Sequence, residues 1–154
     1  MGPIFTIGYE GAALEDFVAT LSAAGVTLLA DIRDRAQSRR AGFSKTALST
    51  AVKGVGISYS HFRSLGDPKK GRDAARSGDW ERFEEIYLAV LNSDAGQAAL
   101  QALCEVAEHE AVCLLCYERD PRFCHRSYVA REVKSDLGCE VIHLGVQPLR
   151  VAAE

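Results

Sequence analysis

The sequence predicts an α/β fold, a three-layer sandwich in which helices cover both faces of a mainly parallel sheet of about five strands. Short apolar runs alternate along the chain with longer stretches whose apolar residues recur at helical spacing, and this alternation is typical of successive β-α units. The length of 154 residues and the 47% share of apolar residues suit one domain with a sizeable core. No internal repeat or linker divides the chain, so residues 1–154 are expected to form a single domain.

The predicted strands are short apolar runs bounded by glycine or polar residues. Residues 26–32, for example, follow Gly25 and are too few for a typical helix. A continuous apolar run is typical of a parallel strand that is buried on both faces. The five predicted strands lie at residues 4–8, 26–32, 57–62, 111–116 and 141–144.

The predicted helices fill most of the intervals between these strands. In the first, Leu14, Phe17 and Leu21 fall on one face, while Ser44 and Asp79 are suitable N-cap residues for two later helices. Helices are expected to start near residues 14, 44, 79, 94 and 125. Three aromatic residues of the helix that starts near residue 79 are expected in the core, namely Trp80, Phe83 and Tyr87.

The sequence predicts a cytoplasmic protein without a membrane segment. The N-terminus lacks the basic region and apolar core of a signal peptide, and no apolar run is long enough to span a membrane. The five cysteines make an odd count and do not follow the spacing of a disulfide framework. A reducing compartment fits this pattern best.

The net charge of −3 hides a basic middle section. Residues 31–72 contain ten lysines and arginines but only three acidic residues. Two predicted loops, residues 34–43 and 64–78, overlap this section, and long loops in a compact domain are usually functional or mobile. The pattern favours a local anion-binding surface, with a solvated charged loop as the alternative.

Polar side chains follow four of the five predicted strands. Because ligands of open parallel sheets bind outside the carboxyl ends of the strands, these side chains are expected to converge on one site. They come in four pairs, namely Tyr9 with Glu10, Asp31 with Arg33, His61 with Arg63, and Cys116 with Glu118.

A series of short motifs also carries a family resemblance over nearly the whole chain. The main ones are Thr6-Ile7-Gly8-Tyr9-Glu10-Gly11, Asp31-Ile32-Arg33, Ser38-Arg39-Arg40, Gly42-Phe43-Ser44-Lys45, Leu65-Gly66, Asp120-Pro121 and Cys124-His125-Arg126-Ser127. In this order they resemble the DUF488 family of bacterial and archaeal proteins. The resemblance implies an α/β fold but supplies no reaction, because the function of the family is unknown.

The candidate ligand-binding residues are mainly basic. Arginine presents a planar fork that matches phosphate or carboxylate oxygens, and five basic residues are assigned to an anion, namely Arg33, Arg39, Arg40, Lys45 and Arg126. Tyr9, Tyr59 and His61 are candidates for stacking on a base, although aromatic residues at such positions are often only packed.

The candidate catalytic residues are Glu118, Asp31, His125 and Cys124. Glu118 and Asp31 follow strand ends, where two carboxylates would suit hydrolysis or transfer at a phosphoryl or glycosidic centre, with His125 as a further acid or base. Each carboxylate could instead hold a neighbouring arginine in a salt bridge. Cys124 enters a helix beside His125, an environment that lowers the pKa of a thiol and makes it a candidate nucleophile.

The C-x-x-C pair formed by Cys113 and Cys116 is not expected to bind metal. On a strand, residues three apart point to opposite faces, so Cys113 is predicted to be a core residue. Cys116, Glu118, Cys124 and His125 remain as an alternative metal-binding set, but their spacing matches no closed structural site. No metal is therefore predicted.

These observations lead to an enzyme hypothesis with two alternatives. The leading hypothesis is an enzyme that hydrolyses or transfers a group on a phosphate-bearing ligand, either an anionic small molecule or a nucleic acid. The alternatives are a non-catalytic nucleotide or nucleic-acid binding module and a metal-binding protein. The glycine turn after the first strand lacks the G-x-G-x-x-G fingerprint, so Rossmann-type dinucleotide binding gets little support and the cofactor is left unknown. The sequence does not define an oligomeric state.

Overall fold

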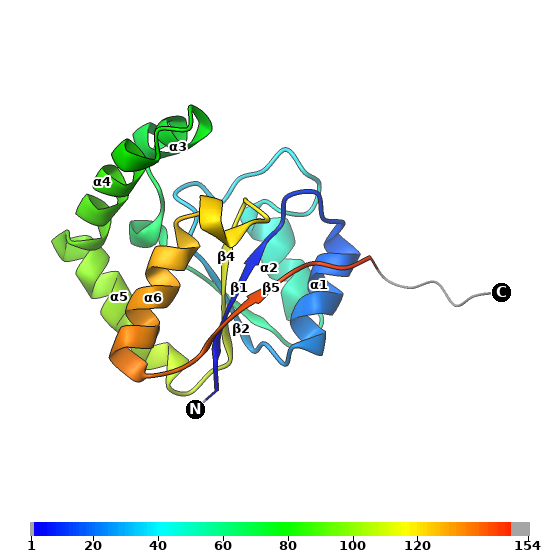
Figure 1. Ribbon diagram of the computed structural model, residues 1–154. Coiled ribbons are helices and arrows are strands. Elements are labelled where there is room, and N and C mark those ends of the chain that lie inside the picture. The colour runs from blue at the N-terminus through cyan, green and yellow to red at the C-terminus, as the bar shows by residue number, and fades with distance from the viewer. Residues whose placement is uncertain (1, 149–154) are drawn as a thin grey trace.

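The computed structural model describes residues 2–148 and contains a five-stranded sheet in which every paired strand is parallel to its neighbour (Figure 1). The strand order is β3-β2-β4-β1-β5. The strands are β1 (Ile4–Gly8), β2 (Leu28–Asp31), β3 (Ser58–His61), β4 (Val112–Cys116) and β5 (Val141–Leu144). The parallel five-stranded sheet confirms the predicted fold class.

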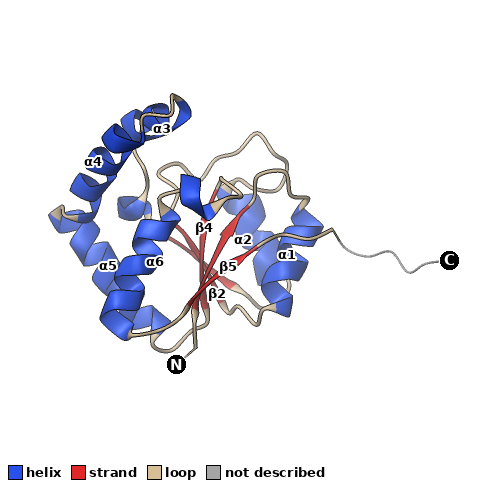
Figure 2. Ribbon diagram, viewed as in Figure 1, coloured by secondary structure: helices blue, strands red, loops and turns tan. Residues whose placement is uncertain are grey.

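Helices cover both faces of the sheet (Figure 2). α1 (Leu14–Ala23) and α2 (Lys45–Lys53) lie on one face, and α4 (Trp80–Leu91), α5 (Asp94–Ala107) and α6 (Arg126–Leu137) lie on the other. Each face has its own apolar cluster: Phe17 and Leu48 pack with Leu29 on the first, and Tyr87 packs with Leu114 on the second. Burial of these apolar faces stabilises the three layers.

The central strands are the most deeply buried, as expected of parallel strands with helices on both sides. β1, β2 and β4 are buried along their whole length. The edge strands β3 and β5 are partly exposed: β3 has a polar sequence, whereas β5 is mainly apolar and leaves Ile142 exposed. Hydrophobic burial therefore specifies the middle of the sheet more strongly than its edges.

The connections between the strands change direction after β3. The chain steps from β1 through β2 to β3 toward one edge of the sheet, and then from β3 through β4 to β5 toward the other edge. As a result, the helices that follow β1 and β2 lie on one face and the helix that follows β4 lies on the opposite face. Such a reversal opens a crevice beyond the carboxyl ends of the strands, where ligands of open α/β sheets bind.

Residues 64–78 contain a helix that the sequence analysis did not predict. α3 (Lys69–Arg76) follows a short 3₁₀ turn (Arg63–Leu65) and packs against α4. Its sequence has no apolar stripe, and the two residues that it buries, Gly71 and Ala74, are small. The Lys69–Asp73 ion pair supports the helix from the solvent side at 2.9 Å. The expectation of a loop was therefore wrong.

Trp80 is another departure from the predicted core. Phe83 and Tyr87 are buried as expected, but the Trp80 side chain is 40% exposed. Trp80 is the first residue of α4, where its ring contacts Phe83 on one side and Phe123 on the other. Helical spacing placed it on the apolar face but did not reveal that this end of the helix extends past the sheet.

Within residues 2–148, none of the helices has both the length and the apolar character that a membrane span requires. α5 has 14 residues and carries acidic groups at Asp94 and Glu105. A helix of about 20 predominantly apolar residues is needed to cross the hydrocarbon core.

Candidate functional site

A cleft of about 820 Å³ lies beyond the carboxyl ends of β1, β2 and β4. Tyr9 follows β1, Arg33 follows β2, and Cys116 and Glu118 lie at the end of β4, so the structure brings these four strand-end residues together. The opposite wall comes from α3 and the start of α4. The remaining lining residues are Asp34, Arg35, Gln37, Ser38, Arg39, Arg40, Asp67, Arg72, Ala75, Arg76, Trp80, Tyr117, Phe123 and His125.

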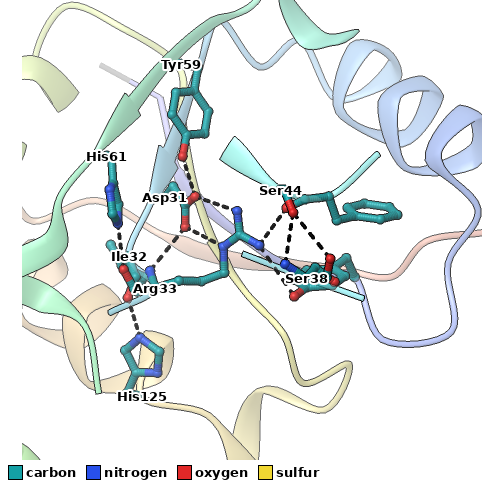
Figure 3. Close-up of polar contacts among 10 residues, drawn as sticks. Asp31, Ile32, Arg33, Ser38, Ser44, Tyr59, His61 and His125 are labelled. Atoms are coloured by element: carbon teal, nitrogen blue, oxygen red, sulfur yellow. Dashed lines mark hydrogen bonds and ion pairs between the residues drawn. The ribbon is translucent and has the colours of Figure 1, made fainter. Parts of the chain in front are cut away.

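Asp31 and Arg33 form a buried ion pair below one wall of the cleft (Figure 3). Asp31 Oδ1 accepts hydrogen bonds from the backbone N of Arg33 at 3.1 Å and from its Nε at 2.8 Å. Asp31 Oδ2 accepts from Arg33 Nη2 at 2.7 Å and from the Tyr59 hydroxyl. Both carboxylate oxygens are thus occupied, and Asp31 does not line the cleft. Its candidate catalytic role stays a prediction.

The Arg33 guanidinium is also committed to the protein. Its Nη1 donates to the carbonyl of Phe43 at 2.7 Å. This bond connects the basic loop, residues 34–43, to the end of β2. Burial alone would lower the pKa of Arg33, but its hydrogen bonds and proximity to Asp31 raise that pKa above the usual value. The arginine is therefore a fixed positive charge at the cleft wall.

Arginines dominate the electrostatics of the cleft, where six of them face three carboxylates. Arg39 and Arg40 come from the basic loop that the sequence singled out, and Arg40 donates to the backbone carbonyl of Ala12. Arg72 and Arg76 come from α3, whose contribution was not predicted. Lys45, the remaining basic candidate from the loop motif, begins α2 and does not line the cleft.

Arg126 is fully buried and organises the segment that follows β4. Its Nε donates to Thr6 Oγ1 at 3.1 Å, and its two Nη atoms donate to the carbonyls of Glu118 and Arg119, the second at 3.0 Å. Gly8 permits this arrangement because a Cβ there would lie 1.8 Å from the Glu118 carbonyl oxygen. The structure thus uses Arg126 to hold the cleft wall, and its role in anion binding stays a prediction.

Of the three carboxylates that line the cleft, Asp67 and Glu118 have raised pKa values. Asp67 Oδ1 is buried without a hydrogen-bond partner among the described residues. Burial raises the pKa of Asp67 to about 7; nearby Arg72 opposes the rise, and the charge of Glu118 adds to it. Burial likewise raises the pKa of Glu118. Asp67 was not among the sequence candidates, because its Gly-Asp-Pro context is typical of an ordinary turn.

His125 lines the cleft at the start of α6 and is held in one orientation (Figure 3). Its Nε2 lies 2.6 Å from the backbone carbonyl of Ile32. Since a carbonyl only accepts, this nitrogen carries a proton and donates it. Burial lowers the pKa of His125 to about 4, so the ring is neutral near pH 7. His61 makes a similar bond to the Arg33 carbonyl at 2.7 Å but does not line the cleft.

Cys116 and Cys124 are joined by a disulfide in the structure. The sequence analysis did not predict this pair, because the two cysteines are eight positions apart with an Asp-Pro turn between them. Cys113 lies in the apolar cluster on the α1 and α2 face, away from Cys116, as the strand periodicity predicted. The ligand atoms of Cys116, Cys124 and His125 lie within 4.8 Å of one another, which makes them a candidate metal-binding group.

Three exposed aromatic residues line the cleft, namely Trp80, Tyr117 and Phe123. Tyr117 and Phe123 are each 45% exposed, and the rings of Phe123 and Trp80 lie 5.2 Å apart between centroids. Tyr9 is instead buried and stacks on Phe43 at 4.7 Å. The sequence analysis assigned stacking to Tyr9, but the accessible rings are those of residues 80, 117 and 123, whose exposure no sequence pattern indicated.

Comparison with known proteins identifies the family. The family model described as a domain of unknown function, DUF488, matches residues 13–133, which is most of the chain. The protein therefore belongs to the DUF488 family, as the motifs of its sequence indicated. Among curated proteins and among solved structures, no significant match was found.

Proposed function

We propose that the cleft binds a phosphate-bearing ligand, a nucleotide or a nucleic-acid strand, and that the protein catalyses hydrolysis or group transfer on it. The observation that carries this proposal is the combination of six arginines, exposed aromatic rings and the carboxylates of Asp67 and Glu118 in one cleft. The cleft volume of about 820 Å³ is in the range of small-molecule sites.

The arginines supply sites for phosphate oxygens. Arg35 and Arg39 are exposed at the cleft, and neither side chain enters a hydrogen bond or ion pair with another described residue. Their guanidinium groups are therefore available to bind a ligand, in contrast to Arg33. Arg72 and Arg76 approach from the opposite wall on α3, so a phosphate between the two walls would meet positive charge from both sides.

The exposed aromatic rings suit the base of a nucleotide. Stacking of a base on an aromatic side chain contributes roughly 1–3 kcal/mol and tolerates different bases. Trp80 and Phe123 present neighbouring rings at one end of the cleft, and Tyr117 presents a third. Nucleobase stacking also explains why large apolar rings remain exposed beside so many charges.

Asp67 and Glu118 supply the acid and base for the reaction. In hydrolysis of a phosphate ester, a water oxygen attacks phosphorus and its proton passes to Glu118. The bond from phosphorus to the leaving oxygen breaks, and that oxygen takes a proton from Asp67. A carboxyl group whose pKa is about 7 is partly protonated near neutral pH, which a general acid requires. With an acceptor hydroxyl in place of water, the same steps transfer the phosphoryl group.

The test combines binding and turnover. Purified protein is incubated with nucleoside mono-, di- and triphosphates and with short DNA and RNA strands, and both affinity and product are measured. We expect Asp67→Asn and Glu118→Gln to reduce turnover at least 100-fold while affinity stays within about threefold. The double variant Arg35→Ala/Arg39→Ala should lose affinity at least tenfold and depend less steeply on salt.

Matched controls remove basic residues elsewhere. Lys53 and Lys134 are exposed near the C-terminal ends of α2 and α6, the ends that lead back toward the amino edge of the sheet. Their alanine variants should match the wild type. If no phosphate-bearing ligand binds, the proposal is overturned; if ligands bind through the arginines but none is converted, the catalytic part fails and the protein is a binding module.

A further inference from the structure

We propose that the reduced protein binds a zinc ion through Cys116 Sγ, Cys124 Sγ and His125 Nδ1, with a fourth coordination position open to the cleft. Zinc binding here is independent of the phosphate ligand, because its ligand atoms are not those assigned to the arginines or to the acid and base. Two thiolates with one imidazole form a donor set that zinc favours.

The three ligand atoms are already grouped. They lie within 4.8 Å of one another and come from the end of β4 and the start of α6. Around a tetrahedral zinc with bonds of roughly 2.1–2.3 Å, neighbouring ligand atoms are about 3.5–3.8 Å apart. The Cα atoms of the two cysteines are 7.2 Å apart, which leaves room for both sulfurs to face a single ion after the disulfide is reduced.

The hydrogen bond of His125 Nε2 leaves Nδ1 facing the two cysteine sulfurs. Because Nε2 donates to the Ile32 carbonyl at 2.6 Å, the lone pair of the neutral ring is on Nδ1. Nδ1 lies 3.7 Å from Cys124 Sγ, on the side of the cysteines. A backbone carbonyl that accepts from the second nitrogen is the usual partner of a metal-bound histidine, since it fixes the tautomer and the ring orientation.

Hydrogen-bond donors lie beside both sulfurs. Arg126 Nη1 lies 3.0 Å from Cys116 Sγ, and the backbone N of Arg126 lies 3.5 Å from Cys124 Sγ. These groups donate to the two sulfurs from a fully buried arginine at the first turn of α6. Donors of this kind stabilise thiolates, the form of cysteine that binds metal.

The ligand count indicates an open site. Structural zinc sites usually close with four protein ligands, whereas catalytic sites keep one position for water or substrate. Cys116 and His125 both line the cleft, as does Glu118 two residues after Cys116. The sequence spacing matched no closed zinc motif, and a three-ligand site that faces a cleft accounts for that mismatch.

Oxidation and metal binding exclude each other at this pair. Reduction of the disulfide by two electrons and two protons, supplied by a dithiol or phosphine reductant, yields two thiols. Zinc binding then releases the two thiol protons as two sulfur–metal bonds form. The oxidised protein offers only the imidazole and should bind zinc weakly.

The test measures metal content directly. The full chain is purified without chelator in the presence of a phosphine reductant, and zinc is counted by mass spectrometry. We expect about one zinc per chain in the wild type, and less than a tenth of that in Cys124→Ser, in His125→Gln and in oxidised wild type. Cys139→Ser is the matched control, because Cys139 is a free cysteine outside the group, and should retain zinc.

Cobalt titration of the wild type avoids dependence on how well the variants fold. One bound Co²⁺ per chain should produce sulfur-to-metal charge-transfer absorption in the near ultraviolet together with visible bands of tetrahedral cobalt, and added zinc should abolish both. Reduced, folded protein that binds neither metal stoichiometrically overturns the proposal, as does a folded Cys124→Ser variant that retains full zinc. Neither readout depends on turnover.

Discussion

Replacement of Asp67 by asparagine should stabilise the protein in a pH-dependent way. In the unfolded chain this carboxyl ionises near 3.8, whereas burial raises its pKa to about 7 in the folded protein. Between these values the folded state binds more protons than the unfolded state, so the free energy of unfolding decreases as the pH rises. The penalty is absent below pH 4 and complete above pH 7.

The structure sets the size of this effect. A carboxyl whose pKa rises from 3.8 to about 7 costs about 4 kcal/mol of folding free energy once it is fully ionised. Roughly 2–3 kcal/mol of that cost develops between pH 5 and pH 8. Asparagine has nearly the same shape but no charge to bury. The free energy of unfolding of Asp67→Asn minus that of the wild type should therefore be about 2–3 kcal/mol larger at pH 8 than at pH 5.

Urea denaturation at a series of pH values measures this difference. Glu15→Gln, which removes an exposed carboxylate from the first turn of α1, reports the effect of losing one surface charge. If the stability difference between Asp67→Asn and wild type is the same at pH 5 and pH 8, Asp67 does not carry a penalised buried charge and the reasoning fails.

Two further substitutions test the packing below the cleft. Gly8→Ala should destabilise the fold by roughly 3 kcal/mol, because the added Cβ would lie 1.8 Å from the Glu118 carbonyl oxygen. Gly2→Ala is the control, because a Cβ there meets nothing within 4 Å. Equal urea midpoints for the two variants would contradict the close contact at Gly8. Arg33→Met should cost about 3–5 kcal/mol because it leaves Asp31 charged and buried, and the double variant that also replaces Asp31 by asparagine should recover part of this loss in the same assay. A double variant that is no more stable than the single one would show that the ion pair is not the cause.

The fold was largely predictable because its strongest signals are local. The apolar run that became β4 (Val112–Cys116) is buried on both faces, and the spacing in α1 placed Phe17 and Leu21 in the core. α3 was not predicted because it is polar and is supported by α4 and by the ion pairs of Asp73 with Lys69 and Arg76 rather than by an apolar stripe.

The candidate site was predictable where it depends on strand ends. Parallel topology alone places Tyr9, Arg33 and Glu118 at one edge of the sheet, and the structure brings them to the same cleft. The sequence did not identify Asp67 or Trp80 as residues of the cleft. Asp67 is buried and Trp80 is exposed because of how α3 and α4 extend beyond the sheet. Neither property is encoded in the neighbouring residues.

The fluorescence of Trp80 tests the central claim most directly. It is the single tryptophan of the chain and lies in the wall of the cleft with 40% of its side chain exposed. Titration with a nucleotide or a short oligonucleotide should change its emission saturably, with an affinity that falls as salt rises and falls at least tenfold in Arg35→Ala/Arg39→Ala. Emission that stays constant while every phosphate-bearing ligand is added to millimolar concentration would contradict phosphate-ligand binding in this cleft.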